Sequence, residues 1–151
     1  MDNNSCRAEA QRIRECVERV RSRISIKLLE ENDQQSSYAA RNKGIVAAAG
    51  AEYLAFTDAD CRPAETWLQA GIACLEENEA DLAGGNVCFT FADKPTAAEI
   101  IDASTSMQME RDIAEHGVTK TANLFVKREL FDELGLFDGS KTSGEDVCRT
   151  K

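Results

Sequence analysis

The stretch YLAFTDAD, residues 53–60, decides the fold class of this chain. Its first five residues form a nearly continuous apolar run without clean alternation, and the run ends abruptly in Asp58-Ala59-Asp60. A strand of this kind is typical of a parallel sheet, because alternation disappears when both faces are covered. We therefore predict a covered strand over 53–57 whose carboxyl end carries two acidic side chains.

Helical and strand-like patterns alternate on both sides of this strand. Between residues 13 and 20, apolar side chains recur at i, i+3, i+4 and i+7, which is the stripe of an amphipathic helix. The patterns predict helices over 6–21, 39–50, 63–75, about 95–114 and 130–134, and strands over 24–29, 53–57, 82–91 and 122–126. Gly84-Gly85 predicts a close backbone approach. The alternation predicts an α/β protein with a largely parallel sheet.

Size and charge exclude several classes of protein. The 151 residues, with a mass of 16.6 kDa, have room for one domain with a single modest core. No window approaches the roughly 18 consecutive apolar residues of a membrane span, and no signal peptide opens the chain. We therefore expect no membrane span and a cytoplasmic location. The 27 acidic residues outnumber 18 Lys and Arg, a net charge of −9 that repels nucleic acid.

The six cysteines do not have the spacing of a zinc site, because no C-x-x-C pair occurs and the chain has a single histidine. Their even number leaves disulfides open, but a reducing cytoplasm favours free thiols. We expect them to be small core residues.

Asp58 and Asp60 are the first candidates for chemistry. In open α/β sheets, ligands bind beyond the carboxyl ends of the strands. Two carboxylates there repel each other, and a divalent cation would relieve this repulsion and bridge to a diphosphate. Metal-assisted chemistry on a nucleotide diphosphate fits this pair. A solvated turn that leads into the next helix fits it as well.

Gly144-Glu145-Asp146 forms a second acidic site. A carboxylate held over an acceptor hydroxyl would serve as a general base, whereas acidic residues at a helix N-terminus also favour the helix dipole. Arg41 and Lys43 lie in a third candidate segment, where their charges would neutralise a phosphate or simply face solvent on a helix.

Taken in order, these segments resemble the nucleotide-diphospho-sugar transferase domain of glycosyltransferase family 2, which has the GT-A fold. The motifs that carry the resemblance run through nearly the whole chain: Asp2-Asn3-Asn4-Ser5, Ala40-Arg41-Asn42-Lys43-Gly44, Phe56-Thr57-Asp58-Ala59-Asp60, Gly84-Gly85, Ala122-Asn123-Leu124 and Ser143-Gly144-Glu145-Asp146. The resemblance implies one partial domain over residues 1–151. It would be a three-layer, Rossmann-like α/β domain with a mostly parallel sheet flanked by helices.

The resemblance also assigns donor-side roles by position. Asp2 matches an Asp that contacts the nucleoside of the donor, and Arg41 and Asn42 match a motif that lines the donor pocket. Asp58 matches the ribose or metal side of the D-x-D element. Asp60 matches the carboxylate that binds Mg²⁺ or Mn²⁺ on the diphosphate.

On the acceptor side, Asp146 matches the catalytic base of inverting family members, and Glu145 would support the acceptor site. The implied activity is metal-dependent transfer of a sugar, with inversion, from a nucleotide-diphosphate sugar to the hydroxyl of an unidentified acceptor.

The chain departs from the family pattern at both ends. Met1 directly precedes Asp2, so we expect the family's first two strands and the helix between them to be missing and the predicted 24–29 strand to lose its usual neighbour. Acceptor-binding elements that normally follow Asp146 are missing too. We therefore expect a domain truncated at both ends, with a second copy of the chain covering the exposed sheet edge as a homodimer.

Two other classes remain open. One is a truncated, non-catalytic nucleotide-binding or self-associating module derived from the same family. The other is a nucleotidyltransferase, which shares a similar α/β core. The 143–146 element, and the lack of a glycine-rich start loop with Arg or Lys, argue against the nucleotidyltransferase.

Overall fold

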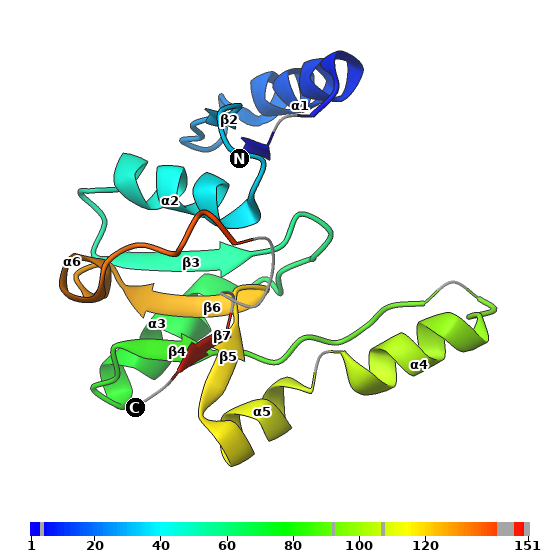
Figure 1. Ribbon diagram of the computed structural model, residues 1–151, viewed down its shortest axis with the longest axis vertical. Coiled ribbons are helices and arrows are strands. Elements are labelled where there is room, and N and C mark those ends of the chain that lie inside the picture. Colours follow the sequence, from blue (N-terminus) through cyan, green and yellow to red (C-terminus); the bar gives the residue numbers. More distant parts are fainter. Residues whose placement is uncertain (4, 92, 107, 142–146, 150–151) are drawn as a thin grey trace. The chain divides into compact units, whose positions relative to one another are not determined.

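The computed structural model describes residues 1–3, 5–91, 93–106, 108–141 and 147–149, the last of these ranges as backbone alone. The chain forms two compact units, whose elements are labelled in Figure 1. The first unit comprises residues 1–51 and 131–145, and the second comprises residues 52–130 and 146–151.

The first unit contains a short parallel strand pair and two long helices. β1 (Asp2–Asn3) pairs with β2 (Glu30–Glu31). α1 (Arg7–Val20) and α2 (Ser37–Ala47) confirm the two predicted helices, and their ends lie within three residues of the predicted ones. The Ser36 hydroxyl accepts a hydrogen bond from the backbone N–H of Tyr38 at 3.3 Å. A side-chain cap of this kind fixes the start of α2.

The prediction of a strand over 24–29 is wrong. The ladder lies at Glu30–Glu31, because the partner strand β1 offers only two residues for pairing. One further backbone bond, from the N–H of Asp2 to the carbonyl of Leu29 at 2.9 Å, precedes it. The expected loss of a neighbouring strand is not confirmed, since β2 pairs with β1.

Aromatic side chains form the core of the first unit beside α2. The ring of Phe137 lies 6.1 Å from that of Tyr38 and 5.6 Å from that of Phe131. Tyr38 and Ile45 of α2 are each 2% exposed. The predicted short helix is confirmed as α6 (Leu130–Leu134), and it ends at Gly135, whose φ of 84° favours glycine.

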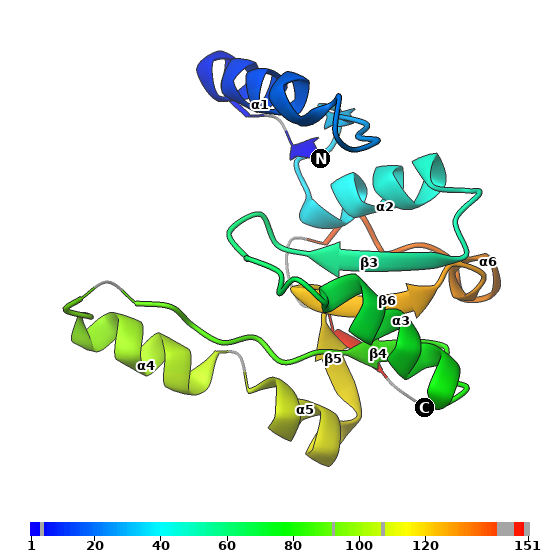
Figure 2. The same ribbon diagram turned by 180° about the vertical axis from the view of Figure 1, so that it is seen from behind.

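The second unit has a three-stranded sheet in the order β3-β6-β4. Its strands are β3 (Tyr53–Thr57), β4 (Leu82–Gly84) and β6 (Asn123–Lys127), and β6 runs antiparallel to both neighbours. β3 and β4 therefore run in the same direction on either side of β6. α3 (Trp67–Glu77) lies against one face of this sheet (Figure 2).

The α/β prediction is confirmed, but the expectation of a mostly parallel sheet is wrong for the described strands. Three of the four described pairings are antiparallel, and only β1 with β2 is parallel. The reason is that β6, which comes late in the sequence, inserts between two strands that would otherwise be parallel neighbours. Ala55 and Thr57 of β3 are exposed, so this strand is also less covered than its apolar run predicts.

The strand predicted over 82–91 is shorter, because its partner ends first. β4 stops at Gly84, which pairs with Leu124, and the N–H of Gly85 donates to the carbonyl of Asn123 at 2.9 Å. Asn123 is the first residue of β6, so no further ladder position is available on that strand.

The helix predicted over about 95–114 is divided into α4 (Ala97–Thr105) and α5 (Met109–His116). The hydroxyls of Ser104 and Thr105 each donate to the carbonyl of Ile101 at 2.8 Å. Side chains that bond to the backbone in this way compete with the helical pattern, which accounts for the end of α4. β5 (Val118–Lys120) and β7 (Val147–Arg149) form an antiparallel pair that the sequence analysis did not predict.

Five of the six cysteines are described with their side chains, and these five are free, in line with the expected thiols. The expectation that they lie in the core is wrong, because four of the five are exposed: Cys6, Cys16, Cys74 and Cys88. In the portion of the chain that the structure describes, no helix has both the length and the apolar character needed to span a membrane.

Candidate functional site

Asp2 lies at the start of the chain in a tight turn. Its carboxylate accepts a hydrogen bond from the backbone N–H of Ser5 at 3.1 Å, and the residue is 5% exposed. The Ser5 hydroxyl, followed by the Ser5 backbone N–H, holds the pKa of the Asp2 carboxyl below its ordinary value. The predicted Asp-x-x-Ser turn is thus present, with its acid held in the ionised form.

Glu31 is an acid of the first unit that the sequence analysis did not single out, and several contacts fix its carboxylate. Its Oε1 accepts hydrogen bonds from the backbone N–H groups of Asp33 at 2.8 Å and Gln34 at 3.1 Å. Its Oε2 lies 3.4 Å from Nζ of Lys43. These contacts, with the Gln34 N–H first, hold the pKa of Glu31 below its ordinary value. Glu31 therefore joins the end of β2 to α2.

Arg41 and Lys43 behave differently, although the sequence analysis treated both as possible phosphate ligands. Lys43 is used internally, since its Nζ pairs with Glu31 and also donates to the carbonyl of Glu30. The guanidinium of Arg41 lies over the ring of Tyr38, 5.5 Å from its centroid. A guanidinium on a ring face keeps its charge while its position is restricted.

Asn42 makes a reciprocal pair of hydrogen bonds with the backbone of Phe137. Its Nδ2 donates to the carbonyl at 2.8 Å, and its Oδ1 accepts from the N–H at 3.0 Å. Both halves of the amide are therefore engaged in holding the 131–141 segment against α2. Contact between Asn42 and a donor stays a prediction.

Asp58 and Asp60 lie directly beyond the carboxyl end of β3, as predicted. The N–H of Cys61 donates to the carbonyl of Asp58 at 3.1 Å, which closes a turn around Ala59. Asp60 is exposed, and the Cys61 thiol makes a weak contact of 3.9 Å with its Oδ1. Carboxylate oxygens are ligands that Mg²⁺ and Mn²⁺ prefer, so the chemistry of this pair fits such a cation.

The remaining ligands of such a cation would come from elsewhere. Across the described ranges, no group of three or more His, Cys, Asp or Glu side chains gathers where it could hold a metal ion. A cation held by two carboxylates would keep further coordination positions open. The oxygens of a bound diphosphate and of water would fill these positions.

Asn123 holds both ends of the loop that carries Asp58 and Asp60. Its backbone pairs with Thr57, the residue just before the loop. Its Oδ1 accepts a hydrogen bond from the indole N–H of Trp67, the first residue of α3, at 2.9 Å. The amide also donates from Nδ2 to the carbonyl of Asn86 at 2.9 Å. Sequence reasoning placed Asn123 in a family motif but did not identify this clamp.

Gly85 leaves the space that the Asn123 side chain occupies, and Gly84 leaves space for Thr119. A Cβ at Gly85 would lie 2.3 Å from Nδ2 of Asn123, and one at Gly84 would lie 1.9 Å from Oγ1 of Thr119. These distances are far shorter than any van der Waals contact, so side chains at 84 and 85 would displace both neighbours. The predicted close backbone approach is confirmed.

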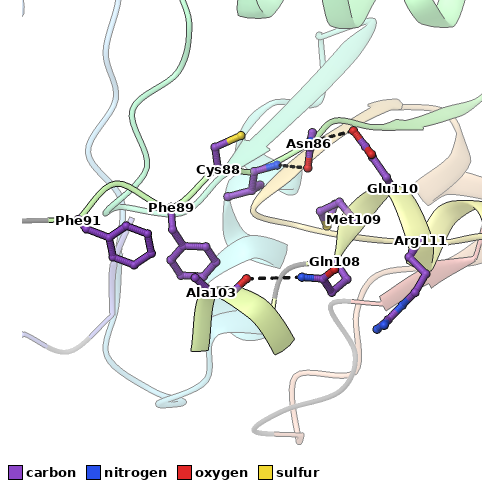
Figure 3. A pocket seen from close by; sticks show the side chains of 10 residues that line it. Asn86, Cys88, Phe89, Phe91, Ala103, Gln108, Met109, Glu110 and Arg111 are labelled. Carbon is purple, nitrogen blue, oxygen red and sulfur yellow. Dashed lines mark hydrogen bonds between the residues drawn. The ribbon is translucent and has the colours of Figure 1, made fainter. Parts of the chain in front are cut away.

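A hollow of about 420 Å³ opens beside this clamp, within the second unit (Figure 3). It lies between the segment that follows β4 and the facing ends of α4 and α5. We call it the aromatic hollow, and its lining residues are Asn86, Val87, Cys88, Phe89, Phe91, Ala103, Gln108, Met109, Glu110 and Arg111.

The predicted site residues fall into three groups. Asp2, Arg41 and Asn42 belong to the first unit, and Asp58 and Asp60 belong to the second. Glu145 and Asp146 lie outside the described residues, and the strand β7 follows directly after them.

Comparisons with known proteins identify a family and a relative of this chain. Residues 1–135 match the family model of Glycosyl transferase family 2. The chain is 45% identical over 127 residues to Glycosyltransferase AglE of Haloferax volcanii. The matched residues make up 84% of this chain and 41% of that relative, so the chain spans less than half of the relative's length. No solved structure matches the chain.

Proposed function

The chain belongs to glycosyl transferase family 2, and from this premise we propose that it binds a nucleotide-diphosphate sugar with a divalent cation and transfers the sugar to an acceptor hydroxyl with inversion. Family membership itself implies a nucleotide-sugar donor and an acceptor. The cation, the inversion and the roles of individual residues are parts of the proposal.

The observation that carries the proposal is the position of Asp58 and Asp60 at the carboxyl end of β3. Ligands of open α/β sheets bind beyond such strand ends. The loop with the two acids is fixed at both of its ends by Asn123. Two carboxylates on a fixed loop are suited to meet a cation that arrives with a diphosphate.

In the proposed donor complex, Asp58 and Asp60 would hold Mg²⁺ or Mn²⁺ at the diphosphate. Asp2 and Arg41 belong to the other unit, and their contact with the nucleotide stays a prediction. The bound cation would supply positive charge that stabilises the leaving nucleoside diphosphate. The ionised Asp2 accepts hydrogen bonds only, so its suitable partner on the donor is a hydroxyl or N–H group.

The transfer step is a direct displacement at the anomeric carbon. Asp146 takes the proton of the acceptor hydroxyl, and the oxygen attacks the face opposite the diphosphate. A new carbon–oxygen bond forms while the bond between the anomeric carbon and the phosphate oxygen breaks. The electron pair of the broken bond leaves with the nucleoside diphosphate, and the configuration is inverted.

The test of the donor site is the Asp60→Ala variant. We expect it to abolish Mn²⁺-dependent binding of the nucleotide in calorimetric titrations while its circular dichroism spectrum stays that of the wild type. The matched control is Glu65→Ala, which removes an exposed acid from the same loop and should leave binding unchanged. Wild-type affinity in the Asp60→Ala variant would remove Asp60 from the site.

A further inference from the structure

We propose that the aromatic hollow binds a saccharide, the acceptor of the transfer reaction. This inference rests on the proposed function, because it gives that reaction its second substrate. The group that binds in the hollow is a neutral sugar ring with free hydroxyls.

The hollow lies at the same edge of the sheet as the candidate metal site. β3 and β4 run in the same direction, and their carboxyl ends flank the first residues of β6. Asp58 follows the end of β3, and Asn86 follows Gly84-Gly85 at the end of β4. The side chain of Asn123 connects the two places, since it contacts both Trp67 and Asn86. A donor and an acceptor that react must meet at one edge of the sheet.

Phe89 and Phe91 provide an apolar platform. Their positions are two apart, so in an extended segment they project to the same side. The ring centroids are 6.3 Å apart and the ring planes differ by 13°. The rings are exposed although they are large and apolar, at 38% and 43%. Figure 3 shows both rings beside the hollow. A sugar ring has an apolar C–H face that packs on aromatic rings of this kind.

Polar groups line the other side. Asn86 donates from Nδ2 to Oε1 of Glu110 at 3.0 Å, and its Oδ1 accepts from the N–H of Val87 at 2.9 Å, so both side chains are held in place. Among the residues that the structure describes, Oε2 of Glu110 has no hydrogen-bond partner. A carboxylate oxygen accepts from hydroxyls, which a sugar presents in adjacent pairs.

Gln108 and Met109 form the floor of the hollow between the two helices. The amide of Gln108 donates to the carbonyl of Ala103 at 3.5 Å, which joins the start of α5 to the end of α4. Met109 is 1% exposed and gives an apolar base. The volume of about 420 Å³ falls in the range that is typical of ligand pockets, about 300–1,000 Å³.

The charges of the hollow favour a neutral polyol over other ligands. Its charged side chains are Glu110 and Arg111, one of each sign, so it offers no excess positive charge for a phosphate. A purely apolar ligand would cover Asn86, Gln108 and Glu110 without bonding to them, which is costly. A sugar can pack its C–H face on the rings and form hydrogen bonds with the polar side chains.

The experiment is saturation-transfer NMR of the whole chain with a panel of methyl glycosides: glucoside, galactoside, mannoside and N-acetylglucosaminide. We expect at least one of them to bind, with transfer concentrated on the protons of one face of the ring. Phe91→Ala should weaken that binding at least tenfold. The control is Ile101→Ala, which removes an exposed apolar side chain from α4 outside the hollow and should leave binding unchanged.

Other results would overturn the inference. These are an absence of binding across the panel, wild-type binding in Phe91→Ala, or displacement of the bound glycoside by UMP, which would identify a base-stacking site. Titration of UDP and GDP with Mn²⁺, in the wild type and in Phe91→Ala, separates the two proposals. Retained nucleotide binding with no glycoside binding in the wild type contradicts only the acceptor site. If the wild type shows no metal-dependent binding of UDP or GDP, the proposed function is contradicted.

Discussion

The acidic side chains of this chain differ in how many hydrogen bonds they accept. Asp2 accepts a hydrogen bond from the backbone N–H of Ser5, Glu31 accepts two from the backbone N–H groups of Asp33 and Gln34, and both acids have a lowered pKa. Asp60, by contrast, is exposed, and among the described residues the Cys61 thiol makes a contact of 3.9 Å with it. An acid whose lone pairs are taken stabilises local structure, whereas one that faces solvent is available to a cation.

The lowered pKa of Glu31 predicts an acid-sensitive contribution to stability. A carboxyl whose pKa is lower when folded stabilises the fold above its unfolded pKa, about 4.5 here, and that contribution is lost as the pH falls through the folded pKa. We expect Glu31→Gln to lower the free energy of unfolding at pH 7, and the difference from wild type to shrink steadily below pH 4.5. Urea unfolding between pH 7 and pH 3 measures this.

The control for Glu31 is Glu65→Gln, which neutralises an exposed loop acid and should change the unfolding curve little at any pH. A difference between wild type and Glu31→Gln that stays constant from pH 7 to pH 3 would contradict the role given to the ionised carboxylate.

The acids of the candidate site were predictable from sequence, but their partners were not. Asp58 and Asp60 follow a strand that local composition identifies, so their position at its end could be predicted. Glu31 and Asn123 gain their roles from Lys43, Trp67 and Asn86, which are 12, 56 and 37 positions away. Such pairings depend on the tertiary fold, which a local pattern does not contain.

At the scale of elements, α3 packs closely on β6 because of a glycine. A Cβ at Gly71 would lie 2.3 Å from ring carbons of Phe125, which is 3% exposed and has little room to move. Gly44, in α2, has nothing within 4 Å of a Cβ. The two glycines occupy helix interiors but face different surroundings, so they form a matched pair for mutagenesis.

Alanine at the two positions should have opposite effects. We expect Gly71→Ala to destabilise the protein by about 1–3 kcal/mol, because the overpacked ring must shift. Gly44→Ala should stabilise it by up to about 1 kcal/mol, because alanine is the better helix former. Urea midpoints give both numbers. If Gly71→Ala were as stable as Gly44→Ala, the close packing of α3 on Phe125 would be wrong.

The helices α1, α2 and α6 and the two longest strands were the predictable elements. The amphipathic stripe located α1, and the apolar runs located β3 and β6. The failures concern pairing. β4 is short because β6 begins at Asn123, and the sheet is antiparallel because β6 enters between β3 and β4. Strand order depends on contacts between distant segments, so composition alone could not give it.

At the scale of the whole molecule, the net charge of −9 predicts that salt stabilises the fold. Like charges repel more strongly in the compact state, and raising NaCl from 0.1 to 1 M shortens the screening length from about 10 to 3 Å. We expect the urea midpoint at pH 7 to rise with salt. Near pH 4.7, where the chain has little net charge, the same addition should have a much smaller effect. A fall of the midpoint at pH 7 would contradict the prediction.

Three larger claims stay predictions: a single partial domain over residues 1–151, a homodimer, and a non-catalytic module as the alternative function. Light scattering tests the second, since a stable monomer of 16.6 kDa at micromolar concentration would contradict it. The third would show metal-dependent nucleotide binding without any transfer of sugar.

The central claim is that this chain holds the diphosphate of a nucleotide sugar through a cation at Asp58 and Asp60. Calorimetric titration of UDP and GDP, with Mn²⁺ and then with a chelator in its place, tests it most directly. We expect at least one nucleotide to bind with Mn²⁺ and this binding to disappear with the chelator. Equal binding in both conditions, or no binding of either nucleotide with Mn²⁺, would contradict it.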